Sequence, residues 1–309
     1  MSAQFFAVPK GMNKLGKFNL WVIGFCCLLT MPVASQDCGG TAACKISGPN
    51  GGTYYVSEPK VQATNWARMK LFIFFHGHNG SGAAIMRNKR LSKSLEEAGY
   101  LLVAPDGPQF TFGGRSTRGW AARPEGESPR GQRDDIKFVE NVLADLSTKY
   151  DVDLNSTLVS GFSSGGSMAW YFSCYSSAPL AGVVAVAGGL RRPLPLGGTP
   201  QGDGSVAKTC PGGPRKLVHI HGFSDRQVPL EGRGIRSWHQ GDVFEGLAVQ
   251  RHTNQCQSRP DKVTSKGGYW CRQWTRCGSK TPIRFCLHAG GHGLPQNWLP
   301  DSLIWLEEN

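Results

Sequence analysis

A serine, an aspartate and a histidine occur in contexts that could support nucleophilic catalysis. Ser163 is the centre of a G-x-S-x-G turn that spans 161–165, Asp225 stands in the segment 221–229, and His292 follows two glycines. A neutral hydroxyl is a poor nucleophile, so it needs a base to take its proton and an acid to orient that base. The three residue types therefore predict acyl transfer to Ser163, with His292 as the base and Asp225 as the orienting acid.

Two backbone N–H groups are candidates to stabilise the oxyanion of such a reaction. A His-Gly-x-x-Gly turn begins at His76, so the N–H of His78 could point at the developing charge. The N–H of Ser164 opens the helix after the nucleophile, where the helix dipole also favours negative charge. The same glycine-rich stretch, 77–82, could suggest a phosphate-binding loop, but it lacks the lysine of a P-loop and the dinucleotide-binding spacing.

Apolar runs that alternate with helical patterns indicate how these residues are positioned. We expect buried strands at 69–75, 100–104, 157–161, 182–186, 216–220 and 282–287, and an edge strand at 52–56. We expect helices at 83–99, 134–150, 164–174, 241–250 and 300–308. This order predicts an α/β fold with a mostly parallel central sheet and helices on both faces. Ser163, Asp225 and His292 each follow a strand, and functional residues gather at the carboxyl ends of parallel strands.

The first 35 residues have the composition of a secretory signal peptide. Three lysines and no acidic residue precede the apolar stretch 18–29, and small residues follow it. Met12 is a possible alternative start. A membrane anchor is the competing interpretation, but the apolar stretch is too short to favour it. We therefore expect a signal peptide at 1–35, one catalytic domain at 36–309, a secreted or periplasmic location, and no membrane association after cleavage.

Cysteine usage agrees with export. Ten cysteines less the two at 26 and 27 leave eight, an even number that suits disulfides in an oxidising compartment. Eight cysteines allow 105 pairings, so the sequence does not fix the connectivity. Local spacing suggests Cys38–Cys44, Cys256–Cys271 and Cys277–Cys286, which leaves Cys174 with Cys210. A zinc site is the alternative for the last four, but they lack the paired C-x₂-C spacing of structural zinc sites. We expect no metal and no cofactor.

The formal net charge is +12, and it falls to +9 without the three leader lysines. Basic residues are densest between Arg115 and Arg133, where two glutamates interrupt them. No nucleic-acid-binding motif accompanies them, so we expect a solvated loop and no nucleic-acid partner. Binding of an acidic sugar or polymer end is the remaining alternative.

The mature chain resembles the secreted poly(3-hydroxybutyrate) depolymerase and feruloyl esterase branch of the α/β-hydrolases, which is similar to carbohydrate esterase family 1. The resemblance is carried by Phe75-His76-Gly77, Pro105-Asp106-Gly107, Asp134-Asp135, Gly161-Phe162-Ser163-Ser164-Gly165-Gly166, His221-Gly222-Phe223-Ser224-Asp225 with Val228-Pro229, and Gly290-Gly291-His292. The order Ser, Asp, His along the chain is that of α/β-hydrolases. The resemblance implies an esterase that acts through an acyl-serine without metal or cofactor. It assigns the nucleophile, acid and base to Ser163, Asp225 and His292, and the oxyanion donors to His78 and Ser164.

Several substrates are compatible with this resemblance. The main hypothesis is a poly(3-hydroxybutyrate) depolymerase-like esterase that acts on a hydroxyalkanoate polymer or oligomer. The alternative is a feruloyl or acetylxylan esterase that acts on plant cell-wall polysaccharide. Depolymerases often follow the catalytic histidine with Trp-Pro, whereas here Gly293-Leu294-Pro295 follows it. Phe112, Trp120 and Trp298 are candidates to line the substrate cleft, with ordinary packing as the alternative. A binding protein on a hydrolase scaffold and a peptidase are further alternatives, and the oligomeric state is open.

Overall fold

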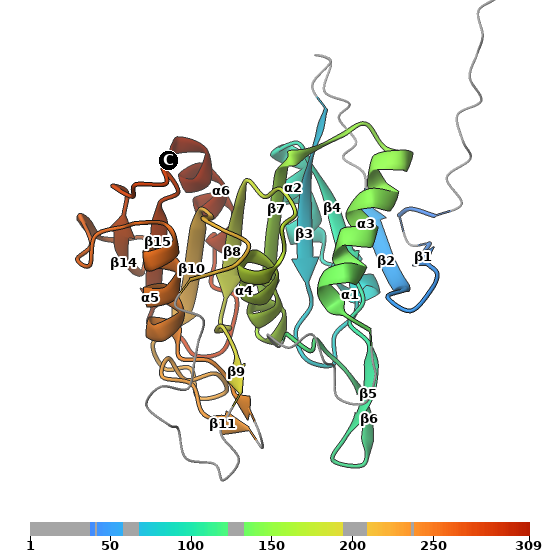
Figure 1. Cartoon of the computed structure of the whole chain (residues 1–309), viewed down its shortest axis with the longest axis horizontal. Coiled ribbons are helices and arrows are strands. Elements are labelled where there is room, and N and C mark those ends of the chain that lie inside the picture. The colour runs from blue at the N-terminus through green and yellow to red at the C-terminus, as the bar shows by residue number, and fades with distance from the viewer. Residues whose placement is uncertain (1–37, 41, 58–67, 123–132, 194–208, 236–237) are drawn as a thin grey trace, which may run out of the picture. The chain divides into compact units, whose positions relative to one another are not determined.

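The computed structural model describes residues 38–40, 42–57, 68–122, 133–193, 209–235 and 238–309 (Figure 1). These residues belong to one unit, Gln36–Asn309. The expected signal peptide at 1–35 lies outside the described residues, so it stays a prediction.

A central sheet organises the described part of the chain. Its parallel strands lie in the order β4 (Tyr100–Pro105), β3 (Met69–Phe75), β7 (Val152–Phe162), β8 (Gly182–Val186), β10 (Leu217–Gly222) and β15 (Ile283–His288). Antiparallel strands extend one edge with β2 (Gly52–Ser57) and β1 (Cys44–Ile46), and the other with β14 (Tyr269–Trp274) and β13 (Lys262–Lys266). The predicted α/β class with a mostly parallel sheet is therefore confirmed. The strand expected at the edge, β2, is covered by β1.

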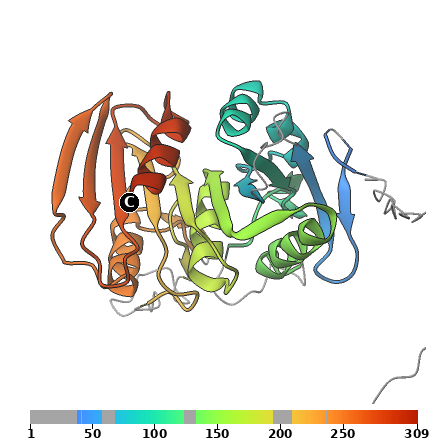
Figure 2. The ribbon, with the colours of Figure 1, turned by 90° about the horizontal axis from the view of Figure 1, so that it is seen from above.

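Helices pack on both faces of the sheet, as Figure 2 shows from above. On one face lie α1 (Gly82–Met86), α2 (Lys89–Glu97) and α6 (Trp298–Glu308). On the other lie α3 (Asp135–Lys149), α4 (Ser164–Tyr175) and α5 (Val243–Thr253). Because successive strand residues point to opposite faces, each strand contributes side chains to two separate apolar cores.

The single helix expected at 83–99 is two helices. Asn88 stands between them and its side-chain oxygen accepts a hydrogen bond from the N–H of Leu91 at 3.1 Å, which caps α2. A side chain that caps a helix also ends the preceding one, because its own backbone leaves the helical conformation. The apolar periodicity continued across this break and concealed it.

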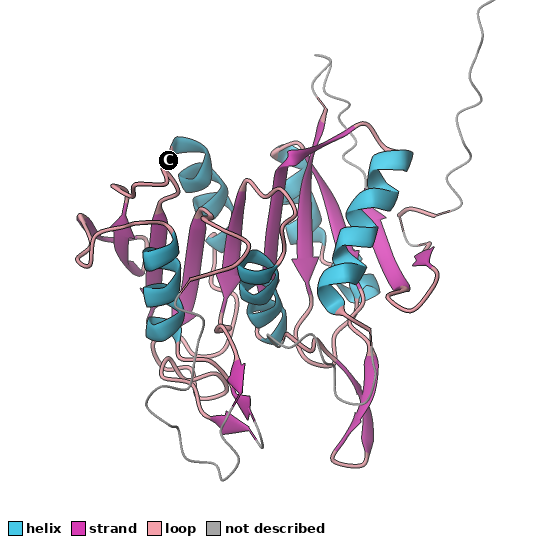
Figure 3. Cartoon of the chain, viewed as in Figure 1, coloured by secondary structure: helices cyan, strands magenta, loops and turns pink. Residues whose placement is uncertain are grey.

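The sequence patterns missed several short strands, which Figure 3 shows in magenta. A hairpin of β5 (Gln109–Phe112) and β6 (Arg115–Arg118) includes the first residues of the basic segment that was expected to be a solvated loop. The strands β9 (Arg192–Pro193), β11 (Gly234–Ile235) and β12 (Trp238–His239) form a small separate sheet. Strands of two to four residues are too short for an apolar alternation to be recognised. The strand β13 was missed because most of its side chains are exposed and polar.

Four disulfides join the cysteines of the described residues. Cys38–Cys44 and Cys174–Cys210 are paired as expected. The other two expected pairs were wrong, because the structure pairs Cys256 with Cys277 and Cys271 with Cys286. Cys271 and Cys286 lie directly opposite each other in the antiparallel strands β14 and β15. Spacing along the chain does not reveal such a cross-strand neighbour.

Within the described ranges, none of the helices combines the length and the apolar character needed to cross a bilayer.

Candidate active site

Ser163 lies at the sharp bend between β7 and α4. Its φ is +59°, a left-handed conformation that is unusual for a residue with a Cβ atom, and its side chain makes no helix-capping hydrogen bond. The bend needs glycine on both sides. A Cβ at Gly161 would overlap the carbonyl of Gly165, and a Cβ at Gly165 would overlap the carbonyl oxygen of Phe75. The backbone therefore presents the Ser163 hydroxyl at the carboxyl edge of the sheet.

His292 connects Ser163 with Asp225. Its Nε2 lies 2.9 Å from Ser163 Oγ, and its Nδ1 lies 2.7 Å from Asp225 Oδ2. A carboxylate can only accept, so Nδ1 of the neutral ring carries the proton and Nε2 is free to accept the hydroxyl proton. This arrangement can activate a serine hydroxyl for attack on a carbonyl carbon.

The Asp225 carboxylate is buried and fixed by the backbone of its own turn. Its Oδ1 accepts hydrogen bonds from the N–H groups of Gln227 and Val228, both at 2.9 Å. Its Oδ2 faces His292 and also lies 3.4 Å from Nε2 of His221. These contacts orient Oδ2 toward the imidazole and compensate the carboxylate for its loss of water.

His288, a second histidine close to His292 in the chain, is directed elsewhere. It ends β15, and its Nδ1 accepts a hydrogen bond from the N–H of Gly290 at 3.1 Å. Partial burial lowers the pKa of the His288 imidazole. The structure therefore brings His292, and not His288, to Ser163.

The loop after β3 lies beside Ser163 and is held by His76. The N–H of Gly107 donates to His76 Nε2 at 2.9 Å, so the ring proton is on Nδ1, which donates to the carbonyl of Gly77 at 2.7 Å. Burial lowers the pKa of His76, which favours this neutral form. A Cβ on Gly77 would lie 3.5 Å from the Ser163 Cβ. The peptide that joins Gly77 to His78 is therefore both next to the serine and fixed in orientation.

The two expected oxyanion donors occupy suitable backbone positions. His78 follows the anchored Gly77 carbonyl, and its side chain lies 3.1 Å from the Thr117 hydroxyl on β6. Ser164 is the first residue of α4 and directly follows Ser163. Their assignment as oxyanion donors remains a prediction.

The three expected cleft residues have different surroundings. Trp120 is only 4% exposed and its indole N–H donates to the carbonyl of His76 at 2.9 Å, so it supports the loop from below. Trp298 is 8% exposed and lies against Phe74, with ring centroids 6.0 Å apart. The side chain of Phe112 lies outside the described part of the structure.

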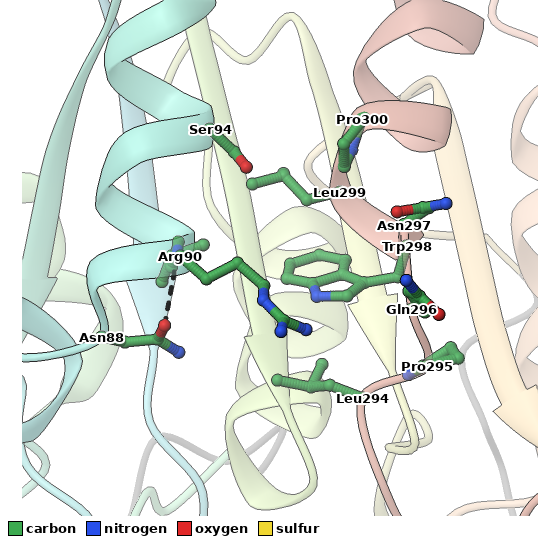
Figure 4. A pocket seen from close by; sticks show the side chains of 11 residues that line it. Asn88, Arg90, Ser94, Leu294, Pro295, Gln296, Asn297, Trp298, Leu299 and Pro300 are labelled. Atoms are coloured by element: carbon green, nitrogen blue, oxygen red, sulfur yellow. Dashed lines mark hydrogen bonds between the residues drawn. The ribbon is translucent and has the colours of Figure 1, made fainter.

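A cavity of about 460 Å³ lies between the start of α2 and the segment that follows His292. Figure 4 shows the Arg90 side chain extending from α2 toward Trp298, with Leu294 beside them. Leu294 stands two residues after His292 and is 39% exposed. Trp298 was a candidate to line the substrate cleft, whereas Arg90 and Leu294 were not. The sequence pattern does not show that α2 and the segment after His292 lie side by side.

Phe223 is a further apolar residue that the sequence reasoning did not single out as a contact. It is 71% exposed and lies in the turn that leads to Asp225. The N–H groups of Phe223 and Ser224 donate to the carbonyls of His288 and Gly290, so this turn is joined to the histidine loop. The signal available in the sequence was an aromatic residue two positions before the candidate acid Asp225.

Among the residues that the structure describes, no group of three histidine, cysteine, aspartate or glutamate side chains is arranged to hold a metal ion.

The mostly parallel sheet and the Ser–His–Asp arrangement at its carboxyl edge define an α/β-hydrolase. The chain belongs to the family described as Phospholipase/Carboxylesterase, whose sequence model matches residues 56–237. The chain therefore has the α/β-hydrolase scaffold of this family.

Curated relatives of low identity are named as feruloyl esterases or probable feruloyl esterases. Feruloyl esterase B of Piromyces equi is 24% identical over 229 residues, which cover 72% of this chain and 39% of the relative. A probable feruloyl esterase C of Aspergillus terreus is 26% identical over 275 residues, covering 86% of each chain. The chain thus spans well under half the length of the first of these relatives.

A solved structure of similar fold is an acetyl xylan esterase from Aspergillus awamori. It superposes with a TM-score of 0.59 at 14% identity and covers 86% of this chain and 99% of its own. At this identity the similarity concerns the fold alone.

Proposed function

We propose that the chain is a secreted serine esterase that cleaves esters of aromatic acids, of the kind found on plant cell-wall polysaccharides. The observation that carries the proposal is His292, whose Nε2 faces Ser163 Oγ at 2.9 Å while its Nδ1 faces Asp225 Oδ2 at 2.7 Å. No metal or cofactor is needed for this chemistry.

The reaction follows from the proton positions. His292 Nε2 takes the Ser163 proton as Oγ bonds to the ester carbonyl carbon, and Asp225 stabilises the resulting imidazolium. The N–H groups of His78 and Ser164 stabilise the oxyanion. The alcohol leaves with the proton from His292, and water then repeats the sequence to release the acid and restore Ser163.

The feruloyl esterase relatives favour the hypothesis of an aromatic acyl ester as substrate over that of a hydroxyalkanoate ester. The exposed Phe223 and Leu294 stand two residues from Asp225 and from His292 in the chain and support it, since exposed apolar side chains near a catalytic site suit a planar aromatic acyl group. The four disulfides support secretion, because such bonds persist in oxidising compartments.

The test of the chemistry is Ser163→Ala. We expect kcat on 4-nitrophenyl acetate to fall by at least about a thousandfold, because the nucleophile is removed. The wild type should also be labelled by a fluorophosphonate probe, which a binding protein on the same scaffold would not be. Turnover of an amide at a rate equal to the matching ester would instead indicate a peptidase.

The test of the substrate is a panel of methyl ferulate, acetylated xylan and hydroxybutyrate oligomers. We expect methyl ferulate to have the highest kcat/KM. Phe223→Ala should raise KM for methyl ferulate more than for 4-nitrophenyl acetate. Phe244→Ala is the matched control, because Phe244 is 49% exposed but lies on α5 against Phe285. A higher kcat/KM for hydroxybutyrate oligomers than for methyl ferulate would instead favour the hypothesis of a depolymerase-like esterase.

A further inference from the structure

A chain of hydrogen bonds runs through the core behind Asp225. The Trp170 indole Nε1–H on α4 donates to Nδ1 of His219 at 3.0 Å. Nε2 of His219 lies 3.1 Å from Nδ1 of His221, and Nε2 of His221 lies 2.7 Å from the carbonyl oxygen of Val228. All three rings are fully buried. The reaction as derived above makes no use of these residues.

The Trp170 indole determines which atom is the donor in each hydrogen bond of this series. An indole N–H can donate but cannot accept, so Nδ1 of His219 must carry a lone pair and the proton must be on Nε2. That proton is donated to Nδ1 of His221, which places the proton of His221 on Nε2 as well. The carbonyl of Val228 requires the same arrangement, because a carbonyl oxygen can only accept.

This series of hydrogen bonds ends at the turn that contains Asp225. The N–H of Val228 donates to Asp225 Oδ1 at 2.9 Å, while its carbonyl accepts from His221. The same Nε2 atom of His221 lies 3.4 Å from Asp225 Oδ2, the oxygen that faces His292. His221 therefore fixes the Asp225 turn to β10 and places a donor beside the carboxylate.

We propose that His221, held in its Nε2–H form by Trp170 through His219, is a positioning residue that orients Asp225 toward His292. The inference rests on the proposed serine esterase function for its kinetic consequence but not for its structural one. Without the His221 donor, the Val228 carbonyl loses its partner and the carboxylate can turn away from His292.

The surroundings favour the neutral rings that this role needs. Burial lowers the pKa of His221, and the Asp225 carboxylate and the Val228 carbonyl only partly oppose this effect. Burial lowers the pKa of His219 strongly, and a positive His221 would lower it further. His288 and His292 are the other titratable groups near His221, and each would disfavour its protonation when positively charged.

The structural part is tested by NMR of protein labelled with ¹⁵N-histidine. We expect His219 and His221 to show the nitrogen shifts of neutral rings protonated at Nε2, in wild type and in Ser163→Ala. Trp170→Phe removes the indole donor and should allow His219 to populate the Nδ1–H form. An imidazolium or an Nδ1–H ring at either position in the wild type at pH 7 would overturn the proposal.

The kinetic part compares three variants on 4-nitrophenyl acetate. His221→Phe keeps a ring but removes both nitrogens, and should lower kcat by about tenfold to a hundredfold with KM unchanged. His221→Gln retains one acceptor and one donor and should recover much of that loss. Ile220→Val is the control, because Ile220 is buried on the opposite face of β10 and should leave kcat within about twofold.

The outcomes separate this inference from the proposed function. If wild type lacks esterase activity but both rings are Nε2–H, the function fails and the hydrogen-bonded chain stands. If wild type is active and His221→Phe keeps its kcat, or His221→Gln is no better than His221→Phe, the positioning role is wrong. Should His221→Phe not fold, kcat of Trp170→Phe decides, with a fall expected and no change contradicting the proposal.

Discussion

His292 contacts Ser163 at 2.9 Å across 129 residues of sequence, although their strands are not neighbours in the sheet. Ser163 follows β7 and His292 follows β15, and β8 and β10 lie between these two strands. The loop after β15 must therefore reach across the carboxyl edge of the sheet. The hydrogen bonds from Phe223 and Ser224 to His288 and Gly290 hold the beginning of that loop.

Substitution of Gly165 should be far more damaging than substitution of another helical glycine. A Cβ at Gly165 would overlap the Phe75 carbonyl oxygen, so α4 could not keep its distance from β3. We expect Gly165→Ala to cost about 3 kcal/mol or more of unfolding free energy and to abolish ester hydrolysis. Urea denaturation and a nitrophenyl ester assay measure both effects.

The matched control for that prediction is Gly246→Ala on α5. The nearest atom to its new Cβ would be Leu190 Cβ at 3.4 Å, an ordinary contact. Because alanine favours a helix over glycine, we expect a gain of about 0.5–1 kcal/mol. Equal destabilisation by both substitutions would contradict the close approach at Gly165.

Two inactive variants of Ser163 should differ in stability. The φ of +59° is strained for any residue with a Cβ and costs on the order of 1–3 kcal/mol. Ser163→Ala keeps this strain, whereas Ser163→Gly relieves it and loses about 0.5–1 kcal/mol through greater freedom of the unfolded chain. We expect Ser163→Gly to unfold at the higher temperature. A lower melting temperature for the glycine variant would show that the bend is not strained.

The two correctly expected disulfides should contribute unequally to stability. Cys174–Cys210 closes 36 residues and Cys38–Cys44 closes 6. Loop-closure entropy then gives about 4 kcal/mol for the first and about 2 kcal/mol for the second. Each pair is replaced by serines, and chemical denaturation measures the loss. A larger loss for Cys38 and Cys44 would contradict the entropic account.

Buried histidines should make the fold less stable as the medium is acidified. Burial lowers the pKa of His76, His219 and His221 from 6.5. The unfolded chain binds protons near pH 6.5, whereas the folded chain binds them only at lower pH. The contribution of these three histidines to the unfolding free energy is therefore complete above pH 6.5. It is lost as the pH falls from 6.5 toward their lower pKa values in the folded protein. Urea denaturation at pH 7.5, 6.5 and 5.5 measures this fall.

The control for the acid effect is His219→Leu. This variant is expected to be less stable at every pH, but its unfolding free energy should fall less between pH 7.5 and 5.5. A fall as steep as that of the wild type would assign the acid sensitivity to other groups.

Much of the fold was predictable because it depends on local patterns. The apolar run at 69–75 is β3 without any change of bounds, and the run at 182–186 is β8. The G-x-S-x-G turn indicated a strand, a bend and a helix, because only glycine fits at 161 and 165. The order Ser163, Asp225, His292 along the chain was enough to name the three candidate residues.

Tertiary structure decided what depends on distant neighbours. The partner of Cys271 depends on the antiparallel pairing of β14 with β15, so spacing assigned it wrongly. Trp120 was expected in the cleft, but its burial under the His76 loop depends on the hydrogen bond between them. The sequence by itself determined the chemistry that is available, since residue types and local turns carry it. Only the packing of remote segments determined which side chains meet, including the Trp170–His219–His221 chain behind Asp225.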